Sequence, residues 1–414
     1  MHSSPSHNRW EKVVPKYNVF RQARATRNGG RPRILLAVTS DISLRLMRGF
    51  PEYLTREGWD VHVVCSPGPV LDETDQNSEV HYHALKMSRN PDPVQDLRAL
   101  VEWIRLCRDI KPDILSTGTP KAGLLGGIAG FVTAVPRRVY HQRGLRLETS
   151  VGIQRLMLGV FERIAIGVAH KVLAVSPSLK AIMITLRLTN EKKIVVIGHG
   201  SSNGVDTREF DPKRFSSDRV EVMRASLGLV KGTMTIGYVG RLTTDKGFNV
   251  LEAAMYSIQA AEISFNLLIV GGVDDFASRA TLQRLHASGL SIASTGAVFD
   301  PAIYYQLMDV LCLPTYREGY PNVVLEAAAS GLATITTDAT GAIDSVLPGV
   351  TGRIVPKGDS TALAKELAAA LSKPIELKAM GVSARSRVEK HYSRPMVWQQ
   401  LNQFYRSEMN SRNK

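Results

Sequence analysis

The sequence predicts an α/β protein with two Rossmann-like, doubly wound domains that face a cleft. The chain of 414 residues is too long for one compact core and suits two domains of ordinary size. Short apolar runs that end in small or polar residues alternate with segments of helical composition. This alternation is typical of parallel strands joined by crossover helices, and it occurs twice along the chain.

The two series of expected strands define the domains. The first series comprises 33–40, 59–66, 113–116, 138–141, 171–176 and 194–198, and the second comprises 235–240, 266–271, 310–314 and 333–337. We therefore divide the chain into a disordered basic arm (1–30), an N-terminal domain (31–205), a C-terminal domain (206–380) and crossover helices (381–414) that pack back on the N-terminal domain. Ligands of such sheets bind beyond the carboxyl ends of the strands.

The positive charge of the chain is concentrated in its first half. Residues 1–200 hold 29 lysines and arginines against 17 acidic residues, a balance of +12 within a total of +14. This excess suits contact with nucleic acid, with an anionic membrane surface or with a phosphorylated substrate, or it belongs to an ordinary solvated surface. No apolar run reaches the length of a membrane span, and the N-terminus does not resemble a secretory signal, so a cytoplasmic protein is expected.

Three cysteines, Cys65, Cys107 and Cys312, lie far apart in the sequence. Their odd number and their spacing indicate free thiols rather than disulfides or a structural zinc site. The ten histidines show no spacing typical of metal ligands, so each is expected on the surface or in the core.

Two carboxylates mark an expected junction between a strand and a helix in the segment 316–331, YREGYPNVVLEAAASG. Glu318 lies on the loop, and Glu326 lies about one turn inside a helix that Pro321 and Asn322 begin. The unpaired N–H groups of the helix N-terminus would lie near both acids, which suits a ligand with hydroxyls at each end and a diphosphate between them. Alternatively, the glutamate in the helix only complements the helix dipole.

A basic loop, YVGRLTTDKG at 238–247, complements this acidic segment. In this loop Arg241 and Lys246 follow Gly240. Two fixed cations at these positions could neutralise a leaving diphosphate without a metal. The loop and the acid pair together resemble the donor site of glycosyltransferase family 4, a retaining family with the GT-B fold. The resemblance covers nearly the whole chain from Arg33 onward. The segments 116–127 and 139–148 look like the branch that builds lipid-linked capsule, O-antigen and exopolysaccharide repeats.

The resemblance implies a hexosyltransferase that uses a nucleotide diphosphate sugar, UDP-linked by family likeness, as co-substrate and needs no cofactor. It implies Glu318, Arg241 and Lys246 as catalytic residues. The donor-binding residues that it implies are Gly240, Arg241, Lys246, Val298, Glu318, Gly319, Tyr320, Pro321, Asn322 and Glu326. In this assignment Glu318 contacts sugar hydroxyls, Glu326 the ribose, and the two cations the diphosphate. The backbone of Val298 contacts the base.

The expected acceptor is a polyprenyl-diphosphate-linked saccharide. Lys121, Arg143 and Arg146 lie near the expected N-terminal cleft and are candidate acceptor-binding residues, although an ordinary basic surface would look the same. The chain departs from many relatives at Ser116 and Gly118, where they carry histidines. The segment 154–172 is expected as a buried packing helix or as an interfacial helix at an anionic membrane, which would keep the protein peripheral to the inner face.

Missing motifs narrow the function class. The chain contains no D-x-D triplet, so no catalytic metal is expected. A nicotinamide-dependent oxidoreductase would need G-x-G-x-x-G after the first strand, which residues 39–50 lack. No basic motif interleaved with aromatic residues supports a nucleic-acid-binding protein. A related glycosyltransferase with a soluble acceptor is the main alternative.

Overall fold

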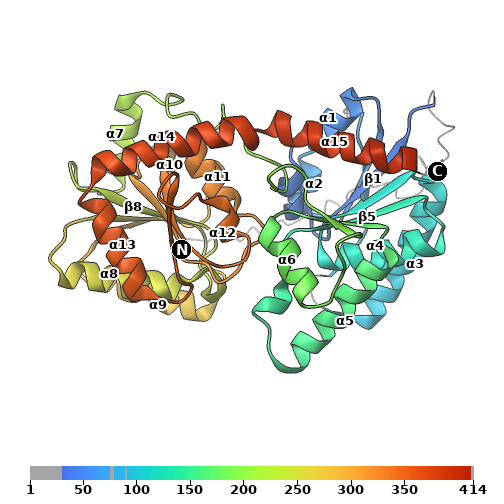
Figure 1. The fold of residues 1–414 in the computed structure, drawn as a ribbon, viewed down its shortest axis with the longest axis horizontal. Coiled ribbons are helices and arrows are strands. Elements are labelled where there is room, and N and C mark those ends of the chain that lie inside the picture. Colours follow the sequence, from blue (N-terminus) through green and yellow to red (C-terminus); the bar gives the residue numbers. More distant parts are fainter. Residues whose placement is uncertain (1–29, 75–78, 89–90, 412–414) are drawn as a thin grey trace, which may run out of the picture.

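The computed structural model describes residues 30–74, 79–88 and 91–411. The basic arm expected at 1–30 lies outside the described residues, apart from Gly30. The chain forms two lobes, which we call the N-terminal half and the C-terminal half, and a parallel sheet lies at the centre of each (Figure 1).

Seven parallel strands form the sheet of the N-terminal half, in the order β3-β2-β1-β4-β5-β6-β7. The strands are β1 (Arg33–Ala37), β2 (Asp60–Cys65), β3 (His81–Ala84), β4 (Ile114–Thr117), β5 (Arg137–Gln142), β6 (Lys171–Ala174) and β7 (Ile194–Val195). The α-helices are α1 (Phe50–Arg56), α2 (Pro69–Asp72), α3 (Pro93–Ile110), α4 (Pro120–Val132), α5 (Gly152–Val168) and α6 (Pro177–Thr185), with 3-10 turns at Asp41–Met47 and Arg146–Glu148. Because β1 is buried along its whole length, both faces of the sheet are covered.

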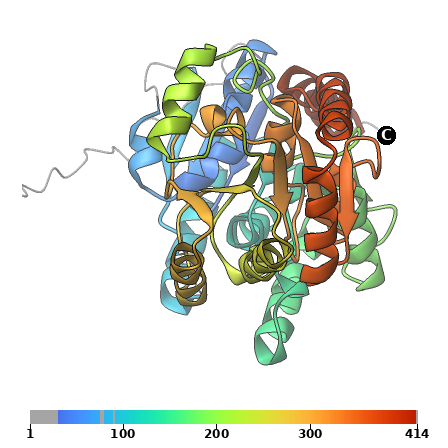
Figure 2. The same ribbon diagram turned by 90° about the vertical axis from the view of Figure 1, so that its left-hand side faces the viewer.

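Six parallel strands form the sheet of the C-terminal half, in the order β10-β9-β8-β11-β12-β13. They are β8 (Thr235–Val239), β9 (Asn266–Val270), β10 (Ser291–Ser294), β11 (Val310–Leu313), β12 (Ala333–Thr337) and β13 (Gly352–Val355). The helices are α7 (Ser217–Ser226), α8 (Phe248–Ala260), α9 (Phe276–Ala287), α10 (Ala302–Tyr305), α11 (Asn322–Ala329), α12 (Ala342–Ser345) and α13 (Ser360–Leu371), with a 3-10 turn at Thr244–Lys246. Figure 2 views this half from its outer side, with helices around the sheet.

The last two helices run across both halves. α14 (Pro374–His391) packs on the C-terminal half, and α15 (Arg394–Asn410) lies over the N-terminal half (Figure 1). The indole of Trp59 donates to the Asn402 side chain over 2.8 Å, and the hydroxyls of Ser116 and Tyr405 lie 2.8 Å apart. These contacts fix α15 against the first sheet, as expected from the sequence.

The two chain connections between the halves lie against each other. The Val205 N–H donates to the Tyr392 carbonyl over 2.9 Å, and the Arg394 N–H donates to the Val205 carbonyl over 3.0 Å. Gly204 allows this approach, because its φ is +65° and a Cβ there would lie 2.7 Å from the Tyr392 oxygen.

The expected two-domain α/β architecture is confirmed, and the sequence analysis missed three strands, β3, β10 and β13. All three are short, and β3 and β10 carry several polar residues, so they lack the apolar runs of central strands. The expected free thiols are confirmed, since Cys65, Cys107 and Cys312 are buried and unpaired. None of the helices in the described part of the chain combines the length and the apolar character that a membrane crossing requires.

A buried glutamate makes the stability of the N-terminal half depend on pH. The Glu162 carboxylate accepts hydrogen bonds from the Tyr140 hydroxyl and the Gln142 amide, each over 3.1 Å. Burial nevertheless raises the pKa of Glu162 from 4.5 to about 7. Between these values the folded chain keeps a proton that the unfolded chain has lost, so stability falls by at most about 1.4 kcal/mol per pH unit as the pH rises.

We therefore expect Glu162→Gln to match the wild type below the unfolded pKa, at about pH 4, and to exceed its stability at pH 8. Urea midpoints of both proteins at the two pH values measure this difference. A difference that stays constant with pH would contradict the assigned burial of the charge.

Candidate active site

A cavity of about 230 Å³ lies between the two halves of the chain. Its lining comes from the carboxyl ends of strands in both sheets and from the loop before α11, as expected for doubly wound folds. The lining residues are Leu46, Arg143, Val175, Ser202, Tyr238, Val239, Gly240, Lys246, Leu313, Glu318, Gly319, Tyr320, Pro321, Asn322 and Val323. Most of the donor-binding residues expected from the sequence thus meet at one cavity, together with Arg143.

The acidic loop connects β11 to α11. The Glu318 N–H donates to the Thr340 carbonyl over 2.8 Å, which ties this loop to the segment after β12. No side chain caps the N-terminus of α11, and the Asn322 and Val323 residues that begin the helix line the cavity. Unpaired N–H groups at a helix N-terminus attract phosphate oxygens, so this end of α11 suits an anionic ligand.

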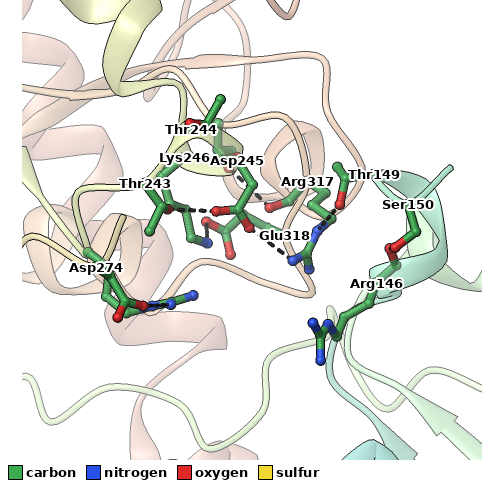
Figure 3. Close-up of polar contacts among 12 residues, drawn as sticks. Arg146, Thr149, Ser150, Thr243, Thr244, Asp245, Lys246, Asp274, Arg317 and Glu318 are labelled. Atoms are coloured by element: carbon green, nitrogen blue, oxygen red, sulfur yellow. Dashed lines mark hydrogen bonds and ion pairs between the residues drawn. The ribbon is translucent and has the colours of Figure 1, made fainter. Parts of the chain in front are cut away.

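The basic loop follows β8 and turns back at Gly247. This glycine has a φ of +72°, and a Cβ there would lie 1.8 Å from the Pro314 carbonyl oxygen. Only glycine therefore fits where the basic loop crosses the end of β11. The turn directs Lys246 toward the acidic loop, where its Nζ lies 2.5 Å from Oε1 of Glu318 (Figure 3). Both side chains are largely buried, at 19% and 14% exposed, so the ion pair lies inside the cavity wall.

Further contacts join the two halves beside this ion pair. Arg317 donates to Asp245 over 2.9 Å and to the Thr149 hydroxyl of the N-terminal half over 2.8 Å (Figure 3). The Thr340 hydroxyl donates to Glu148 over 2.5 Å. These contacts hold the 3-10 turn that carries Arg146 next to the acidic loop.

The N-terminal half reaches the acidic loop through its backbone at Arg143. A Cβ at Gly319 would lie 2.1 Å from the Arg143 carbonyl oxygen, so only glycine permits this approach. Burial lowers the pKa of Arg143 to about 10. Within the described part of the chain, the buried Arg143 Nε, Ser202 Oγ and Asn322 Oδ1 have no hydrogen-bond partner, and all three residues line the cavity. Because buried polar atoms are rarely left unpaired, water or a polar ligand in the cavity would serve as their partner.

Five candidate residues do not line the cavity: Arg241, Val298, Glu326, Lys121 and Arg146. Arg241 follows the lining residue Gly240 and forms an ion pair with Asp274. Lys121 pairs with Asp96 over 2.7 Å and is only 12% exposed, so its charge is already balanced within the N-terminal half. Arg146 is exposed on the 3-10 turn across from Arg317 (Figure 3).

Glu326 lies one turn inside α11, as expected, but its carboxylate accepts a hydrogen bond from the Tyr305 hydroxyl over 2.7 Å. Burial raises the pKa of Glu326 to about 7. A contact between this carboxylate and a ribose therefore stays a prediction.

Several lining residues were missed by the sequence analysis. Ser202 directly precedes the 203–206 segment, NGVD, and this neighbourhood at the domain junction is the signal that could have identified it. Leu46 and Val175 lie near the ends of elements whose relative placement depends on long-range packing, and no local pattern marks them.

The arrangement defines a class of enzyme. A cation, an uncapped helix N-terminus and polar atoms surround a cavity between two Rossmann-like halves, an arrangement typical of GT-B glycosyltransferases. In the described residues, one group of possible metal ligands, Asp60, His62 and His81, lies away from the cavity.

Comparisons with known proteins identify the family. The sequence models of "Glycosyltransferase Family 4" and "Glycosyl transferases group 1" match residues 45–209 and 233–373. The capsular polysaccharide biosynthesis glycosyltransferase CapM of Staphylococcus aureus is 37% identical over 90% of this chain and 96% of its own length. The chain therefore belongs to glycosyltransferase family 4.

Two further comparisons agree. An Escherichia coli enzyme named UDP-Gal:alpha-D-GlcNAc-diphosphoundecaprenol alpha-1,3-galactosyltransferase is 27% identical over 70% of this chain and 74% of its own length. The crystal structure of a glycosyltransferase from Rickettsia africae, at 20% identity, superposes with a TM-score of 0.75 over 92% of this chain and 99% of that one. It supports the GT-B fold.

Proposed function

We propose that this enzyme transfers a hexose or N-acetylhexosamine from a UDP-linked donor to a polyprenyl-diphosphate-linked saccharide, with retention of anomeric configuration. The reaction would belong to surface polysaccharide biosynthesis. The observation that carries the proposal is the meeting of Lys246, Glu318 and the α11 N-terminus with Arg143 at one cavity. The names of the Staphylococcus and Escherichia relatives support this pathway and this donor class.

The ion pair between Lys246 and Glu318 suggests how the donor is received. A diphosphate that approaches the α11 N-terminus competes with Glu318 for Lys246, and this exchange frees the carboxylate to accept hydrogen bonds from sugar hydroxyls. As the bond between sugar and phosphate breaks, Lys246 and the helix N–H groups stabilise the charge that develops on the leaving oxygen. Arg241 would add a second cation if it leaves Asp274.

Retention follows if the acceptor attacks from the face that the phosphate leaves. The acceptor hydroxyl forms the new bond to the anomeric carbon while the old bond to the phosphate oxygen breaks. The departing oxygen takes the proton of that hydroxyl, so this route needs no separate base.

The acceptor side rests on Arg143. Its guanidinium lies at the cavity, and its Nε has no hydrogen-bond partner among the described residues, so it can bind a phosphate or sugar oxygen of the acceptor. Arg146 on the neighbouring turn would attract the same anion.

An exposed apolar face on α5 supports peripheral contact with a membrane. Ile153, Leu156, Met157, Val160 and Ile164 are each at least 39% exposed and recur at helical spacing along one face. Arg155 and Arg163 lie on the same helix. α5 lies at the outer edge of the N-terminal half (Figures 1 and 2). Of the two alternatives for this segment, burial in packing applies to the inner face of α5, which includes Gly159 and Ala165.

We expect the wild type to sediment with anionic vesicles and to retain part of this binding at high salt, because apolar insertion is not screened. The double variant Ile153→Asp and Leu156→Asp should lose the salt-resistant part. The matched control makes the same change to aspartate at Phe276 and Ile375, which are 86% and 87% exposed on the C-terminal half. No vesicle binding by the wild type, or equal loss in both double variants, would contradict the membrane assignment.

The function is tested by turnover with a panel of UDP-sugars, followed by mass spectrometry. The acceptors are an undecaprenyl-diphosphate saccharide and the same saccharide free in solution, each with and without EDTA. We expect transfer to the lipid-linked acceptor that persists in EDTA, because protein cations replace a metal at the diphosphate. Activity that is lost in EDTA and restored by Mg²⁺ or Mn²⁺ would overturn the metal-independent mechanism. Equal transfer to both acceptors would favour the soluble-acceptor alternative.

A further inference from the structure

Three possible metal ligands meet at the edge of the first sheet, although their sequence positions suggested no site. Asp60 and His62 are two residues apart on β2, so both side chains lie on the same face of the sheet. His81 begins the neighbouring edge strand β3 and pairs in register with His62. The cluster lies at the amino ends of these strands, whereas the cavity lies beyond the carboxyl ends.

All three ligand atoms lie within 4.8 Å of one another, and the two distances from Asp60 suit one tetrahedral ion. Oδ1 of Asp60 lies 3.4 Å from Nε2 of His62 and 3.6 Å from Nε2 of His81. Bonds of about 2.0–2.2 Å from zinc to nitrogen and oxygen require ligand atoms roughly 3.3–3.5 Å apart in a tetrahedron. The observed separations exceed the usual length of a direct hydrogen bond, so these pairs are not simply hydrogen-bonded to each other.

One of these ligand atoms is buried and has no hydrogen-bond partner among the described residues. The His62 side chain is only 9% exposed, and its Nε2 has no hydrogen-bond partner in the described part of the chain. Its other ring nitrogen, Nδ1, lies 3.0 Å from Nε2 of His83. If His62 donates through Nδ1, the lone pair of Nε2 faces the Asp60 carboxylate, an arrangement that a cation between them would stabilise.

Neighbouring groups hold these ligands in orientation and leave a path for an ion. Arg33 donates through Nε to the other Asp60 oxygen, Oδ2, over 3.0 Å, which turns Oδ1 toward the histidines. His81 is 47% exposed and connects the cluster to solvent.

We propose that Asp60, His62 and His81 bind one Zn²⁺ ion that joins the edge strand β3 to β2. Three protein ligands leave one position for water. Because the ion would lie at the opposite ends of the strands from the cavity, it is compatible with metal-independent sugar transfer.

The test uses the untagged full chain, treated with EDTA, desalted and then given one equivalent of Zn²⁺. We expect about one bound zinc per chain by elemental analysis after a second desalting, together with a rise in Tm. His81→Ala should weaken zinc binding about 100-fold or more and abolish the Tm rise, while His81→Cys, which restores a ligand, should recover much of both. The matched control is His286→Ala, at an exposed histidine of the C-terminal half.

Each contrary result is decisive. Wild-type protein that retains no zinc, or His81→Ala protein that retains as much as the wild type, would overturn the site. Unchanged donor turnover by His81→Ala is expected in either case, so failure of this site would leave the proposed function standing.

Discussion

Replacing Lys246 with alanine is expected to lower kcat by a factor on the order of a hundred or more, as when one preorganised donor to a developing anion is removed. The side chain is only 19% exposed at the cavity and is held by Glu318, so it is preorganised before the donor arrives. Single-turnover transfer under saturating donor measures the effect. The matched control is Lys231→Ala, at a lysine that is 83% exposed on the same half.

The double variant Lys246→Ala and Glu318→Gln tests whether the two residues act as a unit. If Glu318 must be released from Lys246 before it binds the sugar, the loss of kcat in the double variant should be smaller than the product of the losses in the two single variants. Wild-type turnover in Lys246→Ala would show that this loop does not bind the leaving group.

Substitutions at the two glutamates are expected to change different kinetic parameters. Glu318 lines the cavity beside Lys246, so Glu318→Gln should act mainly on kcat. Glu326, if it binds ribose, makes contacts that are similar in the ground and transition states, so Glu326→Gln should act mainly on the donor KM. Glutamine preserves the side-chain volume beside Tyr305, which alanine would not.

The pH dependence separates these roles further. Because the pKa of Glu326 is raised to about 7, the carboxylate that would accept ribose hydroxyls is progressively protonated below that pH. The wild-type donor KM should therefore rise as the pH falls from 8 to 6, and Glu326→Gln should remove this rise. Identical defects in both variants, with the same pH profile, would contradict the separate roles.

More of the residues assigned to the donor line the cavity than of those assigned to the acceptor, for a physical reason. The 238–247 and 316–331 segments are local structures, each a strand end followed by a loop and a helix, so their residue types and spacing determine where Lys246 and Glu318 lie. Placement of the acceptor-side arginines depends instead on how two distant segments approach, as Gly319 and the Arg143 backbone do. Lys121 illustrates the difficulty, because its pairing with Asp96 follows from the packing of α3 against α4.

The edge strand β3 and the side-chain cluster beside it could not be predicted from the sequence, for a related reason. β3 has only four residues and alternates polar side chains, so no apolar run marked it. Without that strand, the proximity of His81 to His62 could not be inferred from one sequence, since register across strands is a long-range property.

The paired chain connections at Val205 and Ser393 have a consequence for how substrates enter. Since both connections are hydrogen-bonded to each other, the halves cannot slide apart without breaking these bonds. We therefore expect relative motion of the two halves to be rotation about this point, as at a hinge. Contacts on the cavity side, such as those of Thr149 with Arg317 and of Glu148 with Thr340, join side chains rather than backbones and can exchange with water. Such a rotation would widen the cavity mouth on opening and would return Arg143 to its place beside Gly319 on closure.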